Sequence, residues 1–326
     1  MHDRISLIQH WLKAELGIDP GTLKPASSDA SFRRYFRVMH DATTLIVMDA
    51  PPEHEDIHPF VRVARMLEGH AVHVPHIHAS CPDRGLMLLE DLGNTPYLDR
   101  LNASTADALY ADAMDTLQHM QACATDGLPL YDEALLQREM GLFDQWFLER
   151  HLDLTLTESE RGMLARTYHQ LTRSALNQPR VFVHRDYHSR NLMITERQSP
   201  GVIDFQDAVA GPITYDLASL LRDSYIEWPE ERVMQWVRAF HHRLMGAGSS
   251  QKDWESFRKD FDLMSAQRHL KVAGIFARLN HRDGKPGYLK DIPLTLRNLT
   301  RSLLPYPEFE PFLLWLNHRV GLEETS

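Results

Sequence analysis

The sequence predicts an α+β protein of two lobes, with a β-rich N-terminal lobe and a mainly helical C-terminal lobe. Three observations carry this prediction. The chain has 326 residues, which is more than one small domain requires. Strand-forming runs gather in the first 90 or so residues, and helical periodicity dominates the rest. We therefore expect residues 1–92 to form one lobe and residues 93–326 to form the other.

The N-terminal lobe begins with an amphipathic helix, because the first 17 residues carry apolar side chains at helical spacing. Strands are expected between about residues 22 and 50, where the run Thr44–Met48 is apolar and β-branched. A proline pair, Pro51 and Pro52, ends them. A helix follows over about residues 56–68, and a strand over Leu86–Leu89 turns away at Glu90.

The C-terminal lobe shows helical periodicity over residues 105–124, 133–151 and 158–177, and Thr157 is placed to cap the third helix. Two apolar segments interrupt the helices and predict short strands. One is VFVHRDYHSRNLMI, from Val181 to Ile194, and the other is GVIDF, from Gly201 to Phe205. Helices resume after Gly211 and Pro212.

The composition argues against several classes of protein. The formal net charge of −10 argues against a nucleic-acid partner, since such proteins normally carry a basic face. Two cysteines exclude a disulfide framework and fit a reducing cytoplasm. The N-terminus lacks the apolar core of a signal peptide, and no run approaches the ~20 apolar residues that span a bilayer. We expect a cytoplasmic protein with no membrane contact.

Three polar residues in the two interrupting segments could act together. Asp186 and Asn191 are five positions apart, and Asp204 ends the second strand thirteen positions later. A hairpin of two short strands would bring Asn191 close to Asp204. Carboxylate and amide oxygens are hard ligands that suit Mg²⁺, while a further carboxylate can orient a hydroxyl and accept its proton. Phosphoryl transfer needs these parts and little covalent chemistry besides.

The run HRDYHSRN resembles the kinase catalytic loop H-R-D-x-x-x-x-N, and the IDF of VIDFQDA resembles the metal-binding D-F-G segment. The chain as a whole resembles the aminoglycoside phosphotransferase family of small-molecule kinases, which have a protein-kinase-like fold. The resemblance implies ATP and Mg²⁺ as cofactors. The roles that it implies are a base at Asp186, magnesium ligands at Asn191 and Asp204, a brace for the catalytic loop at Asp216, and adenine-binding backbone over Leu89, Glu90 and Leu92.

Within that family, several segments of the chain are similar to the kinases of bacterial cell-wall recycling, which phosphorylate the anomeric hydroxyl of N-acetylmuramate and N-acetylglucosamine. This implies a small-molecule sugar substrate and a role in peptidoglycan recycling. If N-acetylmuramate is accepted, its lactyl carboxylate needs a cation, for which Arg222, Arg278 and Arg282 are candidates. Alternative acceptors within the same fold are an aminoglycoside, choline or homoserine.

The chain departs from the usual kinase pattern at two places. It has no lysine between Lys24 and Lys252, and Met48 stands near the position of the phosphate-binding lysine. The stretch SSDASFRRYF also lacks the glycines of a phosphate-covering loop. Either the protein is a non-catalytic pseudokinase, or Arg33 or Arg34 supplies the positive charge and serines such as Ser31 bind the phosphates. We favour the second alternative, because all three metal and base residues are present.

Overall fold

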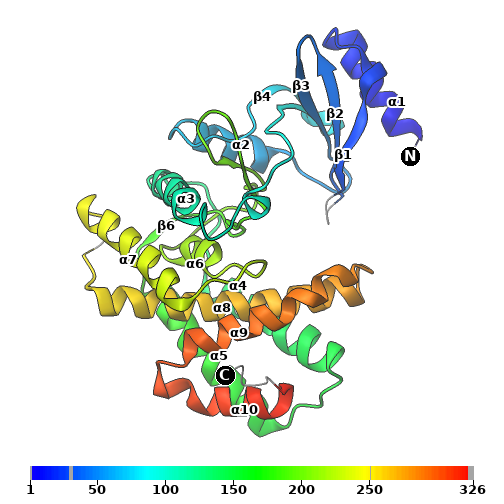
Figure 1. The fold of residues 1–326 in the computed structure, drawn as a ribbon. Helices are drawn as coiled ribbons and strands as arrows, with labels where there is room; N and C mark the ends of the chain where they lie inside the picture. The colour runs from blue at the N-terminus through cyan, green and yellow to red at the C-terminus, as the bar shows by residue number, and fades with distance from the viewer. Residues whose placement is uncertain (1, 29–31, 250, 322–326) are drawn as a thin grey trace. The chain divides into compact units, whose positions relative to one another are not determined.

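The computed structural model describes residues 2–28, 32–249 and 251–321. The chain divides into two compact units, which are described separately below (Figure 1). The first unit is Met1–Pro96 together with Asn191–Asp207, and the second is Tyr97–Arg190 together with Ala208–Ser326. The segment 191–207 thus groups with residues that precede it by about a hundred positions. The lobe boundary expected after residue 92 stays a prediction.

The first unit is built on a five-stranded antiparallel sheet in the order β1-β2-β3-β5-β4. Its strands are β1 (Lys24–Ser28), β2 (Arg34–His40), β3 (Thr43–Asp49), β4 (Ile77–Cys81) and β5 (Leu86–Glu90). Its helices are α1 (His2–His10), η1 (Trp11–Glu15), η2 (Pro20–Thr22), α2 (His58–Glu68) and η3 (Pro82–Arg84). The later segment adds a hairpin of β7 (Leu192–Met193) and β8 (Gly201–Val202).

The core of this sheet lies on the face that α1 and η1 cover. Alternate residues of each strand point to the same face, so Phe36 and Val38 on β2 lie beside Leu45 and Val47 on β3. They pack with Trp11 and other apolar residues of the N-terminal helices, and nearly all of these side chains are buried. The periodicity that predicted an amphipathic first helix is thereby confirmed.

The second unit is mainly helical. Its helices are η4 (Tyr97–Asp99), α3 (Ala106–Gln121), α4 (Glu133–Leu142), η5 (Phe143–His151), α5 (Glu158–Leu176), α6 (Tyr215–Leu221), α7 (Glu230–Gly246), α8 (Trp254–His281), η6 (Pro286–Asp291), α9 (Ile292–Leu303), η7 (Pro307–Phe309) and α10 (Glu310–Val320). One two-stranded sheet pairs β6 (Arg180–Val183) with β9 (Val209–Pro212). Thr157 caps α5 in a reciprocal pair with Glu160, which confirms the cap that the sequence predicted.

Helix α8 is the centre of the second unit. It has 28 residues, most of them buried, and α4, α5, α6, α9 and η5 pack against it (Figure 1). The crossing with α4 is close enough to require glycine: a Cβ on Gly274 would lie 2.3 Å from the carbonyl carbon of Leu142. This approach fixes the position of α8 against α4, and with it the charged side chains that both helices direct inward.

The predicted α+β class is confirmed by the antiparallel sheet of the first unit and the helical second unit. Within the described residues, no helix is both long enough and apolar enough to cross a membrane.

Candidate active site

The loop after β6 is held by a buried carboxylate on α6. Asp216 Oδ2 accepts a hydrogen bond from the backbone N–H of His184 at 2.6 Å, and Asp216 Oδ1 accepts one from the N–H of Arg185 at 3.0 Å. Arg185 has a φ of +80°, a conformation that non-glycine residues adopt only when their surroundings impose it. Burial raises the pKa of Asp216 to about 6, although the neighbouring His184 and the two N–H donors oppose that rise. The brace that the family resemblance assigned to Asp216 is confirmed.

Three further contacts fix the same loop. The fully buried Tyr187 donates its hydroxyl to the carbonyl of Ala113 on α3, at 2.8 Å. The backbone N–H of Ser189 donates to Asp223 Oδ2 at 2.9 Å, and its hydroxyl donates to the same oxygen. The N–H of Asp186 points back to His184 Nδ1 at 3.2 Å. The loop is therefore held by hydrogen bonds on both sides of Asp186.

Two cations and one buried carboxylate form a charge cluster at this loop. Glu139 on α4 is 5% exposed and pairs with Arg185 and, at 3.5 Å, with Lys271 of α8. Lys271 is also 5% exposed and donates to the hydroxyl of Tyr215 at 3.0 Å. Neither Glu139 nor Lys271 was singled out from the sequence, because each looks like an ordinary polar position of a helix. Only the tertiary packing of α4 on α8 buries them.

This charge cluster controls the ionisation of Asp186. Burial is the largest single influence and would raise the pKa of the Asp186 carboxyl, but the positive charges of Lys271, His188, Arg185 and His184 together outweigh it. The result is a pKa lowered to about 2. Asp186 is therefore an anion across the physiological range. It can accept a hydrogen bond from an alcohol and fix the orientation of that alcohol. Because it is a weak base, it can accept the proton only once the alcohol has become more acidic.

Asn191 and Asp204 both belong to the first unit, where the hairpin of β7 and β8 positions them. The N–H of Ile203 donates to the carbonyl of Asn191 at 3.1 Å, so the backbone just before Asp204 is paired with Asn191, as the predicted hairpin requires. Asp204 has a φ of +65°, another strained non-glycine conformation. Its Oδ1 accepts a hydrogen bond from the Gln206 side chain at 2.9 Å.

The donor chemistry of this pair fits magnesium. Mg²⁺ is usually held by one or two carboxylates and keeps its remaining positions for water and phosphate oxygens. One carboxylate and one amide oxygen meet that requirement. Among the described residues, no cluster of three or more His, Cys, Asp or Glu side chains forms a closed protein cage, and closed cages belong to other metals.

The two neighbouring arginines of the first unit have different surroundings. Arg34 donates to Asp49 Oδ2 at 3.0 Å, and Arg4 donates to the other oxygen of the same fully buried carboxylate at 3.0 Å. Arg33 instead lies 3.8 Å from Asp204 Oδ1 and 3.9 Å from Glu55, both longer than a good hydrogen bond. Arg34 is thus committed to the sheet, while Arg33 lies beside the candidate magnesium ligand.

The segment expected to bind adenine lies at the end of β5. Leu89 and Leu92 are buried, and Leu92 packs against Gly201 of β8, where a Cβ would lie only 2.8 Å from its side chain. The side chain of Glu90 is engaged by the loop before β4. It accepts from the N–H of His76 at 3.2 Å and contacts His73 Nε2 at 3.2 Å. Any nucleotide contact from Glu90 would therefore come from its backbone. Ser31 lies outside the described residues.

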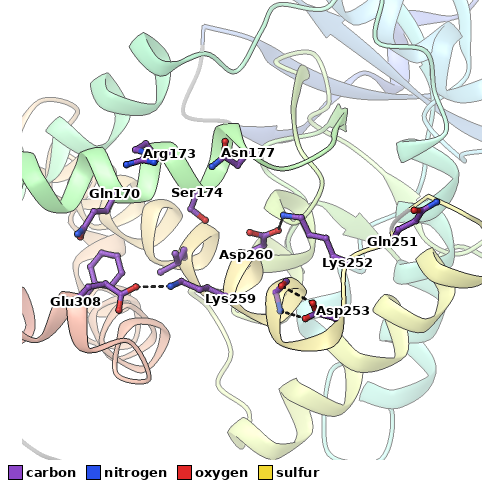
Figure 2. A pocket seen from close by; sticks show the side chains of 13 residues that line it. Gln170, Arg173, Ser174, Asn177, Gln251, Lys252, Asp253, Lys259, Asp260 and Glu308 are labelled. Carbon is purple, nitrogen blue, oxygen red and sulfur yellow. Dashed lines mark hydrogen bonds and ion pairs between the residues drawn. The ribbon is translucent and has the colours of Figure 1, made fainter.

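A pocket of about 600 Å³ opens at the N-terminal end of α8 (Figure 2). Its wall includes Lys252, Lys259 and Asp260, and its charges pair with one another, as in the 2.8 Å contact of Lys259 with Glu308. Lys259 and Lys271 are twelve residues apart, which is about 18 Å along an α-helix. This pocket is therefore distinct from the charge cluster at Asp186.

Comparison of the sequence with known proteins shows the family of the chain. Residues 22–258 match the family model described as the phosphotransferase enzyme family, APH. The chain belongs to this family. It is similar to two Pseudomonas proteins named N-acetylmuramate/N-acetylglucosamine kinase. The one from P. putida is 47% identical over 90% of each chain, and the one from P. aeruginosa is 50% identical over 89% of this chain and 86% of that protein. A Neisseria meningitidis protein of the same name is 41% identical over 98% of this chain and 97% of its own length.

Solved structures of other proteins share the fold. An aminoglycoside phosphotransferase with bound ADP has a TM-score of 0.61 at 14% identity and covers 93% of this chain and 99% of its own. A choline/ethanolamine kinase family protein from Mesorhizobium loti has a TM-score of 0.64 at 13% identity and covers 97% and 99%. At these identities the likeness shows the fold alone, and it confirms the protein-kinase-like fold expected from the sequence.

Proposed function

We propose that this protein is an ATP-dependent kinase that phosphorylates the anomeric hydroxyl of N-acetylmuramate and N-acetylglucosamine. The observation that carries the proposal is the 41–50% identity, over most of the chain, to proteins that bear the name of that activity. The braced HRD loop with its anionic Asp186 supplies the chemistry. Both sugars are building blocks of peptidoglycan, so the proposed role is in its recycling, in the cytoplasm where ATP is available.

In this proposal Asp186 orients the sugar hydroxyl and accepts its proton as the bond to phosphorus forms. Asn191 and Asp204 hold magnesium, which when bound would neutralise charge on the phosphate oxygens. Arg33 supplies the positive charge that the missing lysine would give, because an arginine can bind phosphate through two N–H groups. The backbone from Leu89 to Leu92 binds the adenine.

The low pKa of Asp186 suits the proposed acceptor. An aspartate with a pKa of about 2 gains a proton only late in the reaction, after the hydroxyl has become more acidic through bonding to phosphorus. The anomeric hydroxyl is more acidic than an ordinary alcohol because the ring oxygen withdraws electron density. It therefore demands less of its base than a primary hydroxyl would.

Phosphorus NMR of the reaction product tests this proposal. The protein is incubated with ATP, Mg²⁺ and each sugar, and the expected product is a sugar 1-phosphate whose phosphorus couples to the anomeric proton. A 6-phosphate would contradict the assigned position. ADP without sugar phosphate would contradict the acceptor class.

An acceptor panel separates the alternatives of the same fold. It contains an aminoglycoside, choline and homoserine beside the two amino sugars. Turnover of one of these three in preference to the amino sugars would overturn the substrate assignment while preserving the kinase. A complete lack of turnover, with ATP still bound, would instead support a pseudokinase.

A further inference from the structure

One buried arginine of the second unit is poorly compensated by the described residues. Arg268 lies on α8 and is 3% exposed. Its Nε and Nη1 are sealed from solvent without a hydrogen-bond partner, and among the described residues no carboxylate lies within ion-pair distance of its guanidinium. Arginine keeps its charge at any physiological pH, so it cannot escape burial by losing a proton. A buried, uncompensated charge is costly, so one that is retained calls for an explanation, and a bound ion is one such explanation.

Arg268 is adjacent to the catalytic loop. It lies three residues before Lys271 on α8, which places both side chains on neighbouring parts of one helix surface. The positive charges of Arg268 and Lys271 act on different residues of the loop. Lys271 lowers the pKa of Asp186, while burial and Arg268 both lower the pKa of His188, two positions further on.

The surroundings of Arg268 are polar and incompletely satisfied. His188 Nδ1 is also buried without a hydrogen-bond partner. The rings of His188 and Tyr225 meet edge-on, with their centroids 5.3 Å apart. The guanidinium carbon of Arg190 lies over the Tyr225 ring, 3.9 Å from its centroid. Asp223, whose charge also acts on His188, accepts hydrogen bonds from Ser189 and from the N–H of Tyr225. Among the described residues, the Nε and Nη1 atoms of Arg268 are thus left without an acceptor.

The other arginines considered from the sequence are less suitable. Arg222 is buried but compensated, with Asp262 at 2.8 Å and Glu230 at 2.6 Å. Arg282 is exposed and pairs with its neighbour Asp283 at 2.7 Å. Arg278 also has a buried Nε without a hydrogen-bond partner, but it is only partly buried and lies ten residues beyond Arg268, which is about 15 Å along the helix. Arg268 was not among those candidates, because its burial cannot be read from the sequence.

We propose that Arg268 binds the lactyl carboxylate of N-acetylmuramate and so determines how well this sugar is used relative to N-acetylglucosamine. The inference rests on the proposed function and extends it to a specific subsite. The two sugars differ in the lactyl ether on N-acetylmuramate, which carries the only negative charge of the pair. A guanidinium that lacks an anion in the protein alone would gain one when N-acetylmuramate binds. N-acetylglucosamine would leave it without a partner.

The test compares kcat/KM for the two sugars in the wild type and in two variants. Arg268→Met removes the charge and keeps a long side chain, while Arg268→Lys keeps the charge without the fork of N–H groups. We expect Arg268→Met to lower the ratio of N-acetylmuramate to N-acetylglucosamine turnover by roughly ten- to a hundredfold, which is the strength of a charge-assisted hydrogen bond. Arg268→Lys should lower it less. The matched control Arg282→Met should keep the wild-type ratio.

The methyl ester of N-acetylmuramate makes the test independent of variant folding. It lacks the negative charge, so the wild type should use it less well than the free acid, and Arg268→Met should treat acid and ester alike. An equal loss for both sugars in Arg268→Met, or a wild-type enzyme indifferent to esterification, would overturn the inference. Failure of the wild type to phosphorylate N-acetylglucosamine would overturn the proposed function itself, and this is read first.

Discussion

The start and the middle of helix α8 use charge in opposite ways. At the start of α8, Lys259 is 47% exposed and pairs with Glu308 across a pocket open to solvent (Figure 2). Near its middle, Lys271 and Arg268 are almost fully buried beside the catalytic loop. Lys271 is compensated by Glu139, whereas Arg268 forms no ion pair with the described residues. Exposed pairs are worth little, whereas a buried charge has a large effect whether or not it is paired.

The difference indicates where the fold is committed to chemistry. The pairs around the pocket satisfy themselves and demand no ligand. The charge cluster holds Arg185, Lys271 and Glu139 next to Asp186. Stability alone does not favour this arrangement, since apolar residues of similar size would pack there at less cost. We therefore expect substitutions in the charge cluster to have large effects on stability and turnover, and substitutions at the pocket to have small ones.

The largest effect on stability is expected at Glu139. Glu139→Gln leaves Arg185 and Lys271 without their compensating charge and should lower the free energy of unfolding by about 3–5 kcal/mol. Urea unfolding followed by circular dichroism measures this. The control Glu149→Gln breaks the exposed pair with Arg161 and should cost under about 1 kcal/mol. Equal losses in the two variants would contradict the distinction between buried and exposed charge.

Asp216 should come next. Asp216→Ala leaves the N–H groups of His184 and Arg185 without their acceptor, and each buried unpaired donor costs about 1–3 kcal/mol. The strained loop should then relax, so kcat should fall roughly tenfold or more while nucleotide affinity changes little. Steady-state kinetics and nucleotide titration read the two quantities separately. A variant that loses stability but keeps kcat would show that the brace serves folding alone.

A half-buried carboxylate outside both regions gives a pH signature. Burial raises the pKa of Asp144 to about 6, although the hydroxyl of Tyr168 donates to it. Because the folded protein binds this proton more tightly than the unfolded chain, the stability it contributes is complete below about pH 4 and is lost as the pH rises through 6. The loss should approach about 3 kcal/mol.

Asp144→Asn should remove that pH dependence while keeping an acceptor for Tyr168. Unfolding free energies at pH 4.5 and 7.5 give the comparison: the wild type should lose more stability than the variant over this interval. An identical pH dependence in the two proteins would show that Asp144 titrates normally.

The smallest effect belongs to the pocket at the start of α8. Lys259→Met removes the contact with Glu308 and should change the unfolding free energy by less than about 1 kcal/mol, with no change in kcat. Thermal unfolding and the sugar-kinase assay suffice. A large loss of turnover here would mean that the pocket takes part in the reaction after all.

The sequence was sufficient for features that depend on local patterns. The strands of residues 22–50 and the cap at Thr157 follow from periodicity and short-range chemistry, and the structure confirms them. The HRDYHSRN motif could also be recognised from the sequence, because its residues lie within a few positions of one another. Asp216 could be assigned only through the family resemblance, and the structure then supplied its two hydrogen bonds.

Features that depend on long-range packing could not be predicted. Glu139, Arg268 and Lys271 lie in helical segments whose composition is that of a solvated surface, yet α8 is buried on most of its faces. The grouping of 191–207 with residues before 97 was equally hidden, since it arises from contacts such as that of Val202 N–H with the carbonyl of His73. In both cases the deciding partner is distant in the chain.

The central claim is that the anionic Asp186 receives the proton of the sugar hydroxyl. The direct measurement is kcat with N-acetylglucosamine, together with the Kd for ATP, in Asp186→Asn and in the control Asp112→Asn, which changes an exposed aspartate on α3. We predict that kcat falls roughly a hundredfold or more in Asp186→Asn, with the ATP Kd nearly unchanged and the control like the wild type. A kcat within a few-fold of the wild type in Asp186→Asn would contradict the account.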